Sequence, residues 1–101
     1  MALHLQIIPK VYKDLDRIYN QIASFVSESS ADAIINDIYE LLELATENPE
    51  MGAIGLVEDT RELFPRNGKY RVVYQFDEES LYVLKVALAK QKYPSDDILF
   101  I

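Results

Sequence analysis

Residues 67–90 read NGKYRVVYQFDEESLYVLKVALAK, and they contain the clearest strand pattern in the sequence. Valine, tyrosine and leucine dominate residues 69–76 and 80–90, a composition typical of strands. The acidic residues 77–79 between them predict a turn, so the two strands should pair antiparallel. A shorter strand at residues 61–64 precedes them across a turn at residues 65–68, where Asn-Gly favours positive φ. The pattern therefore predicts a three-stranded antiparallel meander.

Upstream of the meander, apolar side chains recur every three or four residues, which predicts two amphipathic helices. The first helix begins at Pro9, and its apolar stripe ends with Phe25 and Val26. After a short turn the second stripe covers residues 31–45, and Ser29 with Asp32 approximates a capping box. So short a turn predicts an antiparallel helical hairpin.

An alternating segment at residues 3–8 predicts a first strand, and residues 53–60 read as a loop. The fold class is therefore α+β: an N-terminal strand, an antiparallel helical hairpin and a three-stranded antiparallel meander. A chain of 101 residues is expected to form a single domain over residues 1–101.

The composition excludes several function classes. The chain has no cysteine and one histidine, so thiol catalysis, disulfides and histidine metal clusters are ruled out, and we expect no metal and no cofactor. No membrane-spanning stretch or leader signal is visible, which predicts a soluble cytoplasmic protein. The formal net charge of −7 disfavours non-specific binding to nucleic acid.

Charge is unevenly distributed along the chain. Residues 1–60 hold three cations against eleven acids, whereas residues 61–101 hold seven cations against six acids. Alternation places Arg71 on the strand face opposite Tyr70 and Tyr74, while Arg61 begins the neighbouring strand and Lys90 ends the last one. Three cations on an uncovered sheet face could hold phosphate or a carboxylate-rich partner. Equally, they could be edge charges that prevent aggregation.

The same residues carry a family resemblance. The two long strands, together with Asp14-Leu15-Asp16-Arg17-Ile18, Asn48-Pro49 with Gly52, and Arg61-Glu62-Leu63, resemble the RelE/ParE superfamily of bacterial toxins. The likeness covers about residues 3–94, and it implies a helical hairpin packed on a small antiparallel sheet. It also implies a toxin of a toxin–antitoxin (plasmid-stabilisation) module.

Two branches of that superfamily differ in activity. RelE-like toxins cleave ribosome-bound mRNA, and in that reading Arg61, Arg71 and Lys90 would stabilise the phosphate. Gln91 and Asp97 stand where that branch is expected to carry an arginine and a tyrosine. The ParE-like branch, whose members inhibit DNA gyrase by binding and not by catalysis, matches better. A degenerate toxin that only binds an antitoxin is the third reading.

The resemblance implies a cognate antitoxin that is amphipathic and folds on binding. DNA gyrase is the expected target, with ribosome and mRNA as the weaker alternative, and no membrane partner. The apolar tail at residues 98–101 should pack on its own domain, pair as an extra strand or await a partner. The resemblance favours a partner, and self-association into a homodimer is the competing interpretation. The candidate target- or antitoxin-binding residues are Arg61, Arg66, Lys69, Arg71, Lys90, Lys92, Tyr93, Ile98, Leu99 and Phe100.

Overall fold

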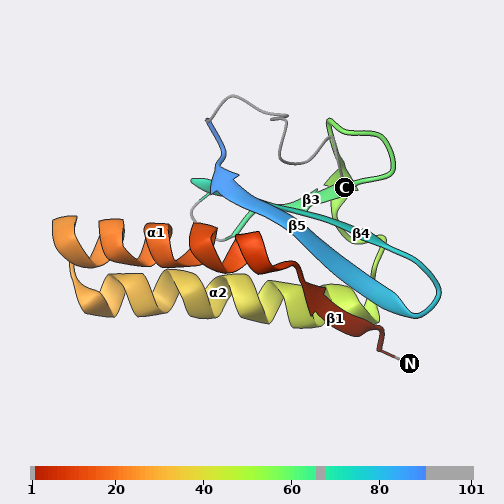
Figure 1. Ribbon diagram of the computed structural model, residues 1–101, viewed down its shortest axis with the longest axis horizontal. Helices are drawn as coiled ribbons and strands as arrows, with labels where there is room; N and C mark the ends of the chain where they lie inside the picture. Colours follow the sequence, from red (N-terminus) through yellow and green to blue (C-terminus); the bar gives the residue numbers. More distant parts are fainter. Residues whose placement is uncertain (1, 66–67, 91–101) are drawn as a thin grey trace.

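Two antiparallel helices cover one face of a five-stranded sheet in the computed structural model, which describes residues 2–65 and 68–90 (Figure 1). The elements in chain order are β1 (His4–Ile7), α1 (Pro9–Phe25), α2 (Glu28–Glu47), β2 (Ala53–Ile54), β3 (Arg61–Leu63), β4 (Tyr70–Phe76) and β5 (Ser80–Leu88). The strand order across the sheet is β1-β5-β4-β3-β2. The α+β class is confirmed.

The predicted meander is confirmed, because β3, β4 and β5 pair consecutively and antiparallel. Two strands add to it. β2 pairs antiparallel with β3, in a segment where a loop was expected. β1 joins the other edge as the parallel partner of β5, with His4 beside Ser80 and Ile7 beside Val83. The sheet is therefore mixed, and its first and last strands lie side by side.

The helical hairpin is confirmed, but its capping differs from the prediction. α2 begins at Glu28, and the side chain of Ser27 accepts a hydrogen bond of 3.0 Å from the backbone N–H of Ser30. Ser29 therefore lies inside the first turn, so the predicted capping box of Ser29 and Asp32 is wrong. The end of α2 at Asn48 agrees with the expected stop before Pro49.

The core forms between the sheet and the hairpin. The alternation predicted for β4 is confirmed, because Tyr70, Val72 and Tyr74 lie in the core. Their buried partners come from α1 and α2 on one side and β5 on the other: Val11, Leu15, Ile18, Ile38, Leu42, Leu81, Val83 and Val86.

One buried carboxylate covers the part of β5 that β1 does not reach. β1 ends opposite Val83, and beyond that point Asp14 of α1 accepts a hydrogen bond of 3.3 Å from the backbone N–H of Val86. Its other oxygen lies 3.3 Å from Nζ of Lys85 and 2.7 Å from Arg17. Since an edge strand presents backbone groups to solvent or to other chains, Asp14 protects this stretch of edge.

Candidate functional site

Arg61 and Arg71 lie on opposite faces of the sheet. The β3–β4 register places Arg61 directly opposite Tyr74, so Arg61 shares the face that Tyr74 presents to the core. Arg71 is three residues from Tyr74 in the same strand and therefore faces the other way. The expectation that the predicted cations converge on one uncovered face is wrong. The β3–β4 register places Arg61 on the face opposite to the one that carries Arg71.

Arg61 and Tyr74 together hold the segment that follows α2. One nitrogen of Arg61, Nη1, donates to the carbonyl oxygens of Glu50 and Gly52, at 3.0 and 2.8 Å. The hydroxyl of Tyr74 donates to the carbonyl of Pro49 at 2.6 Å and accepts from the N–H of Gly52 at 3.0 Å. A Cβ on Gly52 would lie 2.7 Å from this hydroxyl, so the approach requires glycine. We call the two hydrogen bonds of the Tyr74 hydroxyl the Tyr74 clamp. The bonds of Arg61 give it a structural role that the sequence did not reveal.

Arg71 is nearly buried and ion-paired, whereas the sequence placed it on an open face. Its side chain is 13% exposed, and Nη1 lies 3.1 Å from Oε1 of Glu62. Nη2 donates to the carbonyl of Ala89 at 2.8 Å, and the guanidinium lies 5.9 Å from the ring centroid of Phe64. The second oxygen of Glu62 accepts from the N–H of Leu56 at 3.2 Å. Sequence reasoning missed Glu62, although it is the only acid among residues 61–71.

The remaining predicted residues are scattered. Lys69 is exposed just before β4, and Lys90 is exposed in the turn after β5. The last strand ends at Leu88, two residues before the expected end, so Lys90 is not a strand residue. Six candidates lie outside the described residues, and their roles stay predictions: Arg66, Lys92, Tyr93, Ile98, Leu99 and Phe100.

An apolar hollow lies where the tip of the hairpin meets the start of β4. Its volume is about 320 Å³, and its lining consists of Ile22, Val26, Ser30, Ala33, Ile34, Lys69 and Tyr70. Val26 in this lining and Phe25, its neighbour in the sequence, are 71% and 87% exposed, although the helical periodicity counted both as core. The hairpin tip extends beyond the sheet in Figure 1, so no strand of the described part of the chain covers it. We call this hollow with Phe25 the tip groove.

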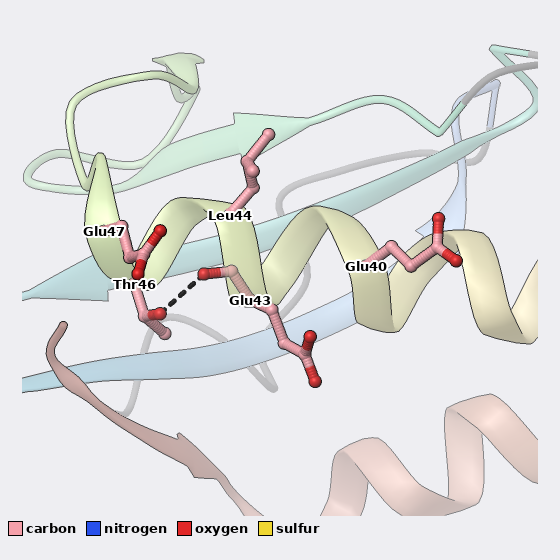
Figure 2. Close-up of a pocket in the computed structure, with 5 residues that line it drawn as sticks. All are labelled: Glu40, Glu43, Leu44, Thr46 and Glu47. Carbon is pink, nitrogen blue, oxygen red and sulfur yellow. Dashed lines mark hydrogen bonds between the residues drawn. The ribbon is translucent and has the colours of Figure 1, made fainter.

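A second hollow, of about 440 Å³, lies along the C-terminal half of α2 and is acidic (Figure 2). The exposed side chains of Glu40, Glu43 and Glu47 line it, together with Leu44 and Thr46. Thr46 donates its hydroxyl hydrogen to the carbonyl of Glu43 at 2.6 Å. Among the described residues, neither these glutamates nor any other three carboxylate or imidazole side chains are arranged so that they could hold a metal ion. These acids form the solvated face of an amphipathic helix.

Burial raises the pKa of Tyr39, Tyr70 and Tyr74. For Tyr74 the hydrogen bond from Gly52 and the positive charge of Arg61 oppose that shift. The site therefore holds Tyr74 as a neutral hydroxyl that both donates and accepts, which is the form the clamp requires.

Within the described ranges, no helix has the length and hydropathy to cross a membrane.

Comparisons with known proteins give a consistent result. Residues 5–93 match the family described as the ParE toxin of the type II toxin–antitoxin system parDE. Among solved structures, the chromosomal ParDE system from P. aeruginosa is similar, at a TM-score of 0.78 and 19% identity, covering 88% of this chain and 98% of that one. A mutant E. coli toxin RelE in the free state reaches 0.66 at 22% identity, covering 89% and 86% of the two chains. No curated protein matches.

Proposed function

We propose that this chain, which belongs to the ParE toxin family of type II toxin–antitoxin systems, inhibits DNA gyrase. It would act in the cytoplasm, by binding the enzyme. The family match over residues 5–93 carries this proposal. The likeness to RelE structures concerns the fold alone, which both branches share.

The contacts of the two arginines support binding over RNA cleavage. Cations that stabilise a transferring phosphoryl group must be able to reach it. Arg61 is bonded to two backbone carbonyls, and Arg71 is paired with the carboxylate of Glu62, which would itself repel phosphate. Of the three cations assigned to the cleavage alternative, Lys90 alone is exposed.

The tip groove is the surface that we assign to the cognate antitoxin. Its lining is mainly aliphatic and aromatic, and Lys69 supplies a positive charge at one side. An amphipathic helix with an apolar face and an acidic residue complements this lining. Binding there would also remove Phe25 and Val26 from water, a gain of about 25 cal/mol for each Å² of apolar surface buried.

The target assignment is tested by two assays with the same purified chain. One measures supercoiling by gyrase, and the other measures cleavage of ribosome-bound message. We expect inhibited supercoiling and intact message. Cut message with unaffected gyrase would establish the RNA-cleaving alternative, and no effect in either assay would identify a degenerate toxin.

The antitoxin surface is tested separately with Val26→Glu, which places a charge in the tip groove. We expect antitoxin affinity to fall by about tenfold or more, with gyrase inhibition retained. Leu44→Glu, on the acidic side of α2 (Figure 2), is the matched control and should leave affinity unchanged. Equal losses in both variants would contradict the assignment of this groove.

A further inference from the structure

A second apolar surface lies on the segment between α2 and β3 and shares no residue with the tip groove. Three of its side chains are large, apolar and exposed: Met51, Ile54 (82%) and Leu56 (65%). Three exposed acids belong to the same segment: Glu50, Glu58 and Asp59. We call these six residues the loop surface. Exposed apolar side chains grouped in this way commonly mark a place where another molecule docks.

Hydrogen bonds from the sheet hold the loop surface in one conformation. Glu62 accepts from the N–H of Leu56, while Arg61 and Tyr74 bind the backbone at the start of the segment. Within it, the N–H of Gly55 donates to the carbonyl of Thr60 at 2.8 Å. An apolar surface that is already ordered loses little conformational entropy when it binds.

The loop surface borders a hollow large enough for a side chain. This hollow has a volume of about 430 Å³ and is lined by Ile54, Asp59, Thr60, Arg61 and Phe76. It opens beside β2, which is the edge strand of the sheet within the described part of the chain. An extended segment lying along this edge could place one of its side chains in the hollow.

We infer that the loop surface binds an extended, positively charged segment of a partner protein that carries large apolar side chains. Residues 50–60 hold three acids and no cation, and the guanidinium of Arg61, at the adjoining hollow, is bonded to the carbonyls of Glu50 and Gly52. This balance repels nucleic acid and anionic membranes, and a second copy would bring the same acids into contact. The inference does not depend on gyrase being the target or on the antitoxin binding at the tip groove.

The probe is a synthetic peptide in which lysine and valine alternate three times, titrated into the ¹⁵N-labelled full chain. We expect amide shifts to concentrate in residues 50–60 and to weaken as salt is added. The twin peptide with glutamate in place of lysine should produce no shifts there. Equal binding of both peptides would overturn the proposal, because charge would then play no part.

The chain contains its own control for negative charge with less exposed apolar surface. The face of α2 in Figure 2 carries three glutamates, Glu40, Glu43 and Glu47, with one exposed large apolar side chain, Leu44. If charge alone attracted the peptide, shifts on α2 would equal those on the loop surface. That result would also overturn the proposal.

Substitutions separate the two contributions. Ile54→Ser with Leu56→Ser should weaken peptide binding by about tenfold, and Asp59→Asn should weaken it and reduce its salt dependence. Phe25→Ser, an equally exposed change at the tip groove, should leave binding unchanged. Unaltered affinity in the double variant would refute the inference. Shifts of residues 50–60 that grow with protein concentration alone would assign the surface to a second copy instead.

Discussion

Glu62 and Arg71 form an ion pair between β3 and β4, with Oε1 and Nη1 3.1 Å apart and both side chains almost inaccessible to water. The same carboxylate binds the N–H of Leu56, and the same guanidinium binds the carbonyl of Ala89. The pair therefore links the segment before β3 to the end of β5.

Removing one member of this pair should be costly. An arginine on an open sheet face could be replaced at little cost in stability, but Arg71 is nearly buried and ion-paired. We expect the free energy of unfolding to fall by about 3 kcal/mol, because Glu62 would remain buried without its cation. Urea unfolding measures this loss, and a double variant with Glu62→Leu should recover part of it. A loss below about 0.5 kcal/mol would show that Arg71 is exposed in solution.

Tyr74→Phe removes a hydroxyl that satisfies two backbone groups. The N–H of Gly52 and the carbonyl of Pro49 would lose their partner, so we expect a loss of about 1–3 kcal/mol. Tyr82→Phe is the matched control, because its hydroxyl makes one exposed contact of 3.4 Å with Asp77. Similar losses in the two variants would contradict a special role for the Tyr74 clamp.

Stability should decline in alkali because burial raises the pKa values of Tyr39, Tyr70 and Tyr74. A raised folded-state pKa means that the neutral phenol is favoured in the fold. Its stabilisation is complete below the ordinary value of about 10 and is lost as pH rises through the folded value. Urea midpoints measured from about pH 9 to about pH 11 should fall, and less steeply in Tyr74→Phe. A flat profile would contradict this reading.

Ser27 and Ser29 offer a direct comparison of the observed and the expected helix cap. Ser27→Ala should lower the free energy of unfolding by about 1 kcal/mol, since its oxygen binds the N–H of Ser30. Ser29→Ala should change it by less than about 0.5 kcal/mol. Thermal or urea unfolding distinguishes the two, and the opposite ranking would restore the predicted capping box.

Asp14→Ala should destabilise the protein by about 3 kcal/mol or more, because it leaves Lys85 buried without its carboxylate and the N–H of Val86 without its acceptor. Asp16→Ala, two residues along α1 and exposed, is the control and should have little effect. Hydrogen exchange of the Val86 amide should accelerate in the first variant alone.

Periodicity was sufficient to predict the local architecture. Steps of three and four identified both helices, and alternation identified the face of β4 that carries Tyr70, Val72 and Tyr74. It could not predict β2, which is only two residues long, or the pairing of β1 with β5. Neither feature leaves a repeating pattern in the sequence.

The candidate site was harder to predict, because it depends on how separate elements align. The face that Arg61 occupies follows from its register against Tyr74, which the composition of β3 does not encode. Likewise, helical spacing grouped Phe25 with the core, although the sheet ends before it reaches the hairpin tip. Alternation assigned Arg71 to the correct face but could not show that Glu62 and Ala89 bind it there.

The parallel pairing of β1 with β5 also sets the order in which a newly made chain can fold. The hairpin needs only contacts between neighbouring segments, so it can form while the rest of the chain is still being synthesised. β1 must wait, because positions 4–7 pair with positions 80–83. A nascent chain that stops before β5 lacks the strand that pairs with β1 on one side and with β4 on the other. The toxin can therefore complete its described sheet only after β5 has been synthesised.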